Sequence, residues 1–478
     1  MASAPDLRRG VAPVLAVALT AALVWLGTGL HPWWPAVWFA PLPVLTYAAS
    51  ASWRHAAIAT AIAWLVGMLS YWHYLHDVLR IPGGFVAQFY SGETLTFTLG
   101  VLLYRALVRR GAYGWAVVAF PAVRVAFEYL LAVAGPHGTA GSLAYTQVEL
   151  LPLLQLASVT GPWGITFVVL LVPAALATAW QLRGAPGRAL RIAGAAALAI
   201  AAVLAFGLSR HIGDESGPLV RVGLVASDPP TSPQQAREGA ATTALLDAYA
   251  HSVEALAAQG AQLIVLPEKI GVVANPGPDS DARFQPLADR TRAVIVVGLV
   301  HANGALDDNE ARIYVPGAPV QAYAKHHLIP AFEQSFRPGT ALSLLAQPSG
   351  TWGVQICKDL DFPALSRDYG RAGVALMLVP AWDFVADGLW HGRMAVMRGV
   401  ESGFAIVRAA KQGYLTVSDN KGRLLAETPS DAAPFATLVA RVPAVHVETL
   451  YLQFGDWFAW LALASLALAI GQTFRRQH

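Results

Sequence analysis

Two long stretches of nearly continuous apolar residues, one toward each end of the chain, constrain the fold more than any other feature. They enclose a middle stretch, from about residue 212 to about residue 450, that carries most of the Asp and Glu. Only 13% of the 478 residues are charged, where a soluble globular protein carries about 25%. This composition excludes a disordered chain and a nucleic-acid-binding protein, and a net charge of +3 is too small for an anionic polymer partner. The sequence therefore predicts a membrane protein with a water-soluble insert.

Eight segments are long and apolar enough to cross a bilayer, because a helix needs about 20 apolar residues to span a hydrocarbon core of ~30 Å. Seven precede the insert and one follows it: 11–30, 34–50, 56–76, 86–107, 114–134, 154–180, 190–209 and 454–473. The second segment is short and broken by Pro. The first resembles a signal peptide, but it is long and lacks a clear cleavage site, so we expect it to be retained.

Basic residues are distributed unequally between the two sides of the predicted bundle, and the more basic loops face the cytoplasm. One side carries Arg80 and Arg210 outside the insert. The other side carries Arg8, Arg9, Arg54, Arg105, Arg109, Arg110, Arg183, Arg188, Arg191, Arg475 and Arg476. This asymmetry predicts that both termini are cytoplasmic and that the insert lies on the outer face of the membrane.

One pair of charges lies inside a predicted span. Arg124 and Glu128 are four residues apart, so a helix places them on the same face. Charges at this depth are costly unless they are paired or hydrated, and they often mark functional sites. Two interpretations stay open: an intramembrane functional pair, or a neutralised pair that holds helices together.

The insert is expected to fold as a layered α/β domain. Its short apolar runs, each ended by Gly, Pro or a charged residue, include LVRVGLVAS, AQLIVLPE and TWGVQICKD, and helical patterns lie near 240–259 and 389–401. We therefore expect three parts. A transmembrane bundle occupies 1–211, the α/β domain 212–452, and a transmembrane helix with a cytoplasmic tail 453–478.

Three residues at the ends of predicted strands carry chemistry. Glu268 follows LIVLP, Lys325 follows QAYA, and Cys357 follows WGVQI. A thiolate can attack a carbonyl, a carboxylate can shuttle protons, and an ammonium can stabilise the oxyanion, which together permit acyl transfer through a thioester. A nearby cation is also expected to lower the pKa of the thiol.

The segments around these residues, LIVLPEKI, YAKHHLIPAFE and GVQICKDLDFP, resemble the signature blocks of the nitrilase (carbon–nitrogen hydrolase) superfamily. The resemblance implies an αββα sandwich with Glu268 as general acid and base, Lys325 as transition-state stabiliser and Cys357 as nucleophile. It also implies supporting roles for Glu333, eight residues after the lysine, and for Asp359.

The resemblance extends into the apolar flanks. GSLAYTQVELLPLLQLASVTGPWG and WHGRMAVMRGVESG resemble blocks of the bacterial apolipoprotein N-acyltransferase family, as does the order of spans, insert and final span. This implies an inner-membrane enzyme in which about eight transmembrane helices carry a nitrilase-like domain on the periplasmic face. Such an enzyme moves a fatty acyl chain from a membrane phospholipid, through a Cys thioester, to the N-terminal amine of a diacylglyceryl lipoprotein.

Several positions differ from the family's pattern. Lys358 replaces an aromatic residue after the Cys, Trp382 lies in the altered block Val-Pro-Ala-Trp-Asp-Phe, and Lys411 replaces an Asn. These three are candidate substrate or pocket residues. The two lysines could add positive charge near the thiolate, bind a phosphate head group, or simply be solvated.

No cofactor or metal is expected. A single Cys excludes an intramolecular disulfide and a multi-cysteine metal cluster, and the adjacent His326 and His327 point to opposite faces of an extended segment. Two other functions stay open. The triad could serve a membrane-tethered amidase or nitrilase-type hydrolase, or an acyltransferase with another acceptor. Alternatively, the chain could be an inactive homologue that binds lipid or acts as a scaffold.

Overall fold

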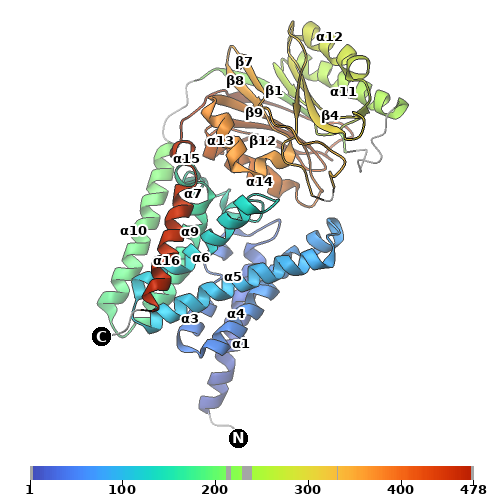
Figure 1. Ribbon diagram of the computed structural model, residues 1–478. Helices are drawn as coiled ribbons and strands as arrows, with labels where there is room; N and C mark the ends of the chain where they lie inside the picture. Colours follow the sequence, from blue (N-terminus) through green and yellow to red (C-terminus); the bar gives the residue numbers. More distant parts are fainter. Residues whose placement is uncertain (1–3, 212–216, 229–238, 331, 475–478) are drawn as a thin grey trace. The chain divides into compact units, whose positions relative to one another are not determined.

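The computed structural model describes residues 4–211, 217–228, 239–330 and 332–474, and the chain forms two compact units (Figure 1). The first unit contains Met1–Gly135, Gly141–Ser209 and Phe454–His478, and the second contains Pro136–Ala140 and Arg210–Gln453. Arg475 and Arg476, which contributed to the predicted orientation, lie outside the described residues.

The first unit is helical. Its elements are α1 (Ala4–Gly27), α2 (Trp34–Val37), α3 (Leu42–Ser50), α4 (Trp53–Met68), η1 (Leu69–Tyr71), η2 (His73–Val78), α5 (Gly83–Arg109), α6 (Tyr113–Ala134), η3 (Leu143–Gln147), α7 (Leu151–Leu154), α8 (Ala157–Thr160), α9 (Pro162–Gln181), α10 (Pro186–Arg210) and α16 (Trp457–Gln472). Each predicted span coincides with helical structure. The predicted span 34–50 is divided into α2 and α3, because Pro41 interrupts the apolar run.

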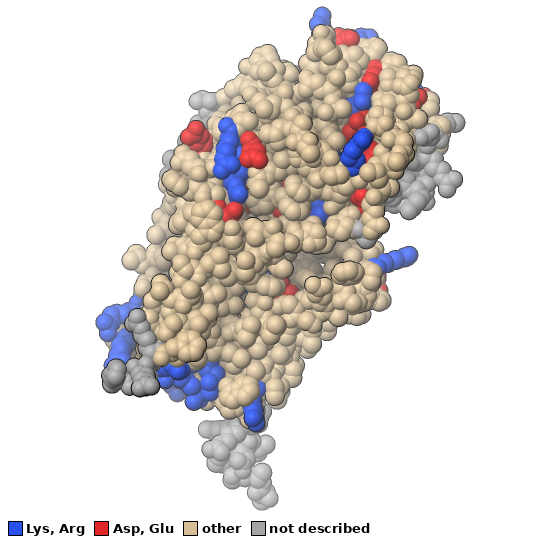
Figure 2. All heavy atoms as spheres, viewed as in Figure 1, with Lys and Arg blue, Asp and Glu red and all other residues tan. Residues whose placement is uncertain are grey.

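Three described helices, α6, α9 and α10, are long and apolar enough to cross a membrane by length and composition. Val11–Gly27, Leu151–Thr160 and Trp457–Gln472 are shorter apolar helices, so the number of about eight spans remains a prediction. Only 11% of the most apolar part of α10 is buried, as expected of a helix that faces lipid. In the view of Figure 2 the helical surface is almost free of charged side chains, and Lys and Arg gather mainly at one end of the helices.

The charged pair inside α6 is formed and has a third member. Arg124 donates to Glu128 Oε1 at 2.7 Å, and also to Glu93 Oε2 of α5 at 2.5 Å. Glu128 Oε2 additionally accepts from Ser142 Oγ at 2.8 Å and from Thr166 Oγ1 of α9 at 2.9 Å. The cluster therefore ties α5, α6, α9 and the loop after α6 together.

The second unit contains two mixed β-sheets. The first has the order β13–β1–β2–β4–β5–β6, with β3 also paired to β4, and the second has the order β12–β11–β10–β9–β8–β7. The strands of the first are β1 (Leu219–Ala226), β2 (Leu263–Val265), β3 (Val272–Val273), β4 (Val294–His301), β5 (Asp308–Tyr314), β6 (Gln321–Ala324) and β13 (Ala436–Pro443). Those of the second are β7 (Leu344–Gln347), β8 (Gly350–Val354), β9 (Val374–Trp382), β10 (Ala405–Lys411), β11 (Tyr414–Ser418) and β12 (Leu424–Pro429).

Helices cover the outer faces of both sheets (Figure 1). They are α11 (Ala240–Ala258), η4 (Gly277–Asp281) and α12 (Ala282–Thr291) beside the first sheet, and η5 (Cys357–Asp361), α13 (Pro363–Arg371) and α14 (Gly388–Ser402) beside the second, with α15 (Leu450–Phe454) following β13. Both helical segments predicted in the insert are confirmed, as α11 and α14.

The inner strands of each sheet, among them β4, β9 and β10, are buried on both faces, which explains their nearly continuous apolar sequences. Successive residues of a strand point to opposite faces. In β4, Val294 and Val296 therefore pack between the two sheets, whereas Ile295 and Val297 pack under α11 and α12. The structure confirms the predicted α/β sandwich of four layers.

Candidate active site

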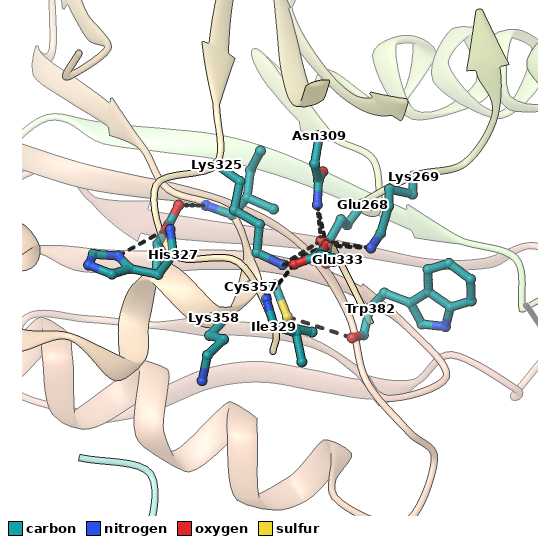
Figure 3. A network of polar contacts seen from close by, with 12 residues as sticks. Glu268, Lys269, Asn309, Lys325, His327, Ile329, Glu333, Cys357, Lys358 and Trp382 are labelled. Atoms are coloured by element: carbon teal, nitrogen blue, oxygen red, sulfur yellow. Dashed lines mark hydrogen bonds and ion pairs between the residues drawn. The ribbon is translucent and has the colours of Figure 1, made fainter. Parts of the chain in front are cut away.

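The residues predicted to form the site come from the ends of strands in both sheets. The strands β1, β2 and β4 run parallel to one another, as do β8, β9 and β10. Chains leaving parallel neighbours emerge at one edge of the sheet, where polar groups can converge. Figure 3 shows Glu268, Lys325, Glu333 and Cys357 pointing toward one another. The predicted triad is therefore brought together.

Glu268 is held on a turn that lies along β4. The Leu266 N–H donates to the Val296 carbonyl, and the Ile270 N–H donates to the Gly298 carbonyl, each at 2.9 Å. Between these bonds the turn passes directly over Gly298, where a Cβ atom would lie 2.3 Å from the Pro267 oxygen. A glycine at this position of β4 is thus required for Glu268 to reach the network.

Lys325 is at the centre of a buried polar network. Its ammonium donates to Glu268 Oε1 at 2.9 Å and to Glu333 Oε2 at 3.0 Å. The Asn309 amide of β5 donates to the same two carboxylates, at 2.6 and 2.8 Å. Burial alone would lower the pKa of Lys325, but the two carboxylates raise it well above its usual value. Lys325 therefore remains an ammonium, the form that stabilises an oxyanion.

Glu333 remains ionised in this network. Burial alone would raise the pKa of its carboxyl group, but Lys325 and Lys269 together hold that pKa well below its usual value. The Ile329 N–H also donates to Glu333 Oε2 at 2.8 Å. The carboxylate is therefore fixed by both side-chain and backbone donors.

Cys357 is the first residue of η5 and lies at a sharp turn after β8. Its φ of 45° is in the left-handed region, it is half-buried, and its Sγ donates to the Trp382 carbonyl at 3.6 Å. Burial and the Glu268 carboxylate raise the pKa of the thiol well above its usual value, and Lys325 opposes this only in part. Lys325 does lower this pKa, as predicted for a nearby cation, but burial and the Glu268 carboxylate outweigh its effect. The resting thiol is protonated at neutral pH and needs a base.

Asp359 organises the backbone around the nucleophile. Its carboxylate accepts the Ile356 N–H at 3.0 Å, the His327 N–H at 2.8 Å and the Tyr323 hydroxyl at 2.7 Å. These bonds connect the segment after Lys325 to the residue before Cys357. The side chain is fully buried and does not itself join the carboxylate–ammonium network.

Lys358 points away from the network in Figure 3. Its ammonium donates to Asp361 Oδ2 at 3.1 Å and to His137 Nδ1 at 3.3 Å, and the residue is only 5% exposed. Of the three predicted possibilities for this lysine, the solvated one is wrong, because an acidic side chain and a ring nitrogen cover its charge.

Lys411 and Trp382 face each other across the paired strands β10 and β9. The Lys411 ammonium lies 3.5 Å from the centroid of the indole ring and donates to the Lys269 carbonyl at 3.0 Å. The lysine is fully buried, so it is not solvated either. Burial and the neighbouring Lys269 lower the pKa of Lys411 to about 7. The indole nitrogen of Trp382 donates to Gln412 Oε1 at 2.8 Å.

Four residues that contribute to the site were not identified from the sequence. Lys269 donates to Glu333 Oε1 at 2.6 Å, and Asn309 joins the two carboxylates. Arg408 and Asp383, whose charges both act on the thiol, form a buried ion pair at 2.5 Å. Adjacency to Glu268 was the one available signal for Lys269. Asn309 lies within a strand, and the residues around it in the sequence do not indicate a role in the site.

Among the described residues, no group of three or more His, Cys, Asp or Glu side chains is arranged to hold a metal ion.

Comparisons with known proteins cover both units. Residues 20–175 match the family described as the apolipoprotein N-acyltransferase N-terminal domain, and residues 232–446 match the carbon–nitrogen hydrolase family. The chain is 28% identical to an apolipoprotein N-acyltransferase of Geobacter metallireducens, over 78% of this chain and 77% of the relative. It is 27% identical to one of Gloeobacter violaceus, over 98% of this chain and 95% of the relative. Among solved structures it is similar to that of an amidase from Nesterenkonia sp., at 23% identity and a TM-score of 0.40, over 49% of this chain and 92% of that chain.

Proposed function

The chain belongs to the apolipoprotein N-acyltransferase family, and we propose that Glu268, Lys325 and Cys357 transfer an acyl chain from a membrane phospholipid to the N-terminal amine of a lipoprotein. The observation that carries this proposal is the Lys325 ammonium, which is buried 2.9 Å from Glu268 Oε1 and lies beside the half-buried Cys357 sulfur (Figure 3).

The first half-reaction forms a thioester. Glu268 takes the proton of the Cys357 thiol, and the thiolate attacks the ester carbonyl of the phospholipid. Lys325 stabilises the resulting oxyanion. When the carbon–oxygen bond breaks, Glu268 returns its proton to the departing alkoxide, so a lysophospholipid leaves and the acyl chain stays on sulfur.

The second half-reaction reverses these roles. The amine attacks the thioester carbonyl while Glu268 takes one amine proton, and Lys325 again faces the oxyanion. Collapse forms the amide and expels the Cys357 thiolate, which regains the proton from Glu268. Because the thiol is protonated at rest, Glu268 must act as a base in the first half-reaction. It acts as a base again in the second, because the attacking amine must lose a proton.

Asp359 and Glu333 have supporting roles in this proposal, since one fixes the backbone next to Cys357 and the other fixes Lys325. Trp382 and Lys411 form part of the wall beside the nucleophile. Lys358 stabilises the turn after Cys357 through Asp361.

We further propose that the first unit is a bundle of about eight transmembrane helices, with the catalytic domain on the periplasmic face of a bacterial inner membrane. In this arrangement 1–211 and 453–478 are membrane parts and 212–452 is the catalytic domain. The gathering of basic side chains mainly at one end of the helices supports this orientation (Figure 2). Labelling of single cysteines introduced into loops, in a Cys357→Ala background, tests it.

The test of function uses the full-length protein in vesicles of phosphatidylethanolamine that carries one labelled acyl chain. Wild-type protein is expected to move the label to a synthetic diacylglyceryl-cysteine peptide. The Cys357→Ala variant lacks the nucleophile and is expected to transfer none, and Gly392→Ala, a change with ordinary contacts on α14, serves as the matched control.

Two results would contradict the proposed function. Release of the label as free fatty acid, with none on the peptide, would indicate a hydrolase that uses water as acceptor. Retention of the label in phospholipid, with a thiol that still reacts with maleimide, would indicate an inactive homologue.

A further inference from the structure

Lys269, the residue directly after Glu268, is buried inside the candidate active site. Its ammonium donates to Glu333 Oε1 at 2.6 Å and lies 3.7 Å from Glu268 Oε1. The residue is only 5% exposed. Its backbone φ of 51° is in the left-handed region, which a lysine adopts only when its surroundings impose it.

Among the groups that form ion pairs with Glu268 and Glu333, the charges balance only when Lys269 is counted. Glu268 and Glu333 supply two carboxylates, whereas Lys325 supplies one ammonium. Without another cation the buried network would carry one uncompensated negative charge, which is unfavourable in a low-dielectric interior. Lys269 supplies the missing positive charge and forms the shorter of the two ion pairs to Glu333.

Several contacts fix the position of Lys269. Its ammonium lies 5.4 Å from the ring centroid of Phe336 and 5.6 Å from that of Trp382. Lys411, at the end of β10, donates to the Lys269 carbonyl at 3.0 Å. Lys411 belongs to the second sheet, whereas the turn that carries Glu268 and Lys269 follows a strand of the first. This bond therefore links the turn to the opposite sheet.

We infer that Lys269 is a positioning residue for acyl transfer, whose ammonium neutralises Glu333 so that the oxyanion forms beside a network without net negative charge. This inference rests on the proposed function. In the first half-reaction the proton moves from Cys357 to Glu268 and the new negative charge appears on the carbonyl oxygen. With Lys269 present, two ammoniums face the remaining Glu333 carboxylate and the oxyanion. Without it, Lys325 alone would face both negative charges.

The test compares wild-type protein with Lys269→Met, Glu333→Gln and the double variant Lys269→Met/Glu333→Gln, each full length and in vesicles. Lys269→Met keeps the length of the side chain and removes its charge. We expect Cys357 acylation by a labelled phospholipid to slow about 100-fold and the acidic limb of its pH profile to move to higher pH. The double variant removes the negative charge that Lys269 balances, so we expect it to acylate at least 10-fold faster than Lys269→Met.

A merely structural ion pair predicts a different pattern. In that case the double variant is no faster than Lys269→Met, and Lys269→Met keeps the pH profile of the wild type. Either this pattern or a Lys269→Met variant with the wild-type rate and pH profile overturns the inference. Because loss of one partner of a buried pair can prevent folding, the charge-balanced double variant remains informative when Lys269→Met does not fold.

A second measurement separates this inference from the proposed function. The rate at which iodoacetamide alkylates Cys357 reports thiolate formation without any acyl donor. Besides Glu268 and Lys325, the thiol faces Asp383 and Arg408, which bind each other and are unchanged in all variants. We expect slower alkylation in Lys269→Met and recovery in the double variant. If wild-type protein takes no acyl chain from phospholipid, the proposed function fails, while this alkylation series still decides the role of Lys269.

Discussion

Replacing Gly298 by Ala is expected to disable the site without touching a charged residue. A Cβ atom at this position of β4 would lie 2.3 Å from the Pro267 oxygen and 2.6 Å from Glu268 Cα. Both are backbone atoms, and real Cβ atoms essentially never come closer than 3.0 Å to their neighbours. The Pro267 oxygen must therefore retreat by about 0.7 Å, from 2.3 Å to that limit, and Glu268 moves with it.

A retreat of this size matters because Glu268 Oε1 is held by donors at 2.6 and 2.9 Å. A misplacement of about 1 Å typically slows catalysis by about 100-fold, so we expect Gly298→Ala to slow acylation of Cys357 by roughly 30- to 100-fold. Overpacking of this kind also costs about 1–3 kcal/mol of stability.

The assay is single-turnover acylation of Cys357 by labelled phospholipid, with thermal unfolding of the same samples. Gly392→Ala is the matched control, because its Cβ would meet nothing closer than Thr416 Oγ1 at 3.6 Å. We expect the control to react at the wild-type rate. A Gly298→Ala variant that acylates as fast as this control would refute the account of how Glu268 is placed.

Three further changes test other parts of the structure. Because burial lowers the pKa of Lys411 to about 7, this residue binds fewer protons in the folded protein than in the unfolded chain between about pH 7 and 10, and its contribution to stability rises with pH across that window. Lys411→Met removes this dependence, so its melting temperature relative to wild type is expected to be higher at pH 6 than at pH 10; a difference that does not change with pH would contradict this. Asp359→Asn is expected to leave buried N–H donors without an acceptor, to lower stability by about 1–3 kcal/mol and to slow Cys357 acylation, both measured against wild type. Arg124→Met leaves Glu93 and Glu128 without their cation and is expected to lower stability by about 3–5 kcal/mol. The triple variant Arg124→Met/Glu93→Gln/Glu128→Gln is expected to recover most of this loss, as measured by thermal unfolding in detergent.

The family and the layered α/β domain were predictable because their signals are local. Strands buried on both faces produce continuous apolar runs, and the three blocks around Glu268, Lys325 and Cys357 each combine a strand end with a polar residue. The comparisons confirm the predicted family. The i, i+4 spacing of Arg124 and Glu128 likewise placed both side chains on one helix face, where they form an ion pair at 2.7 Å.

Other properties depend on contacts between residues far apart in the sequence. Asn309 reaches Glu268 across 41 positions, and Glu93 reaches Arg124 across 31, so no local pattern marks either residue. The net rise of the thiol pKa could not be predicted, because a sequence shows that a cation is present but not how deeply the sulfur is buried. Lys269 was overlooked because a lysine in a turn usually lies on the surface.

The central claim is that Cys357 holds the acyl chain as a thioester, and intact-mass spectrometry of the purified full-length protein tests it most directly. After incubation with phosphatidylethanolamine of known acyl composition, the protein is expected to gain the mass of one acyl group, on the peptide that contains Cys357. Hydroxylamine, or a lipopeptide with a free amine, should remove it. An unmodified Cys357 in a preparation that nonetheless acylates the lipopeptide would contradict the claim.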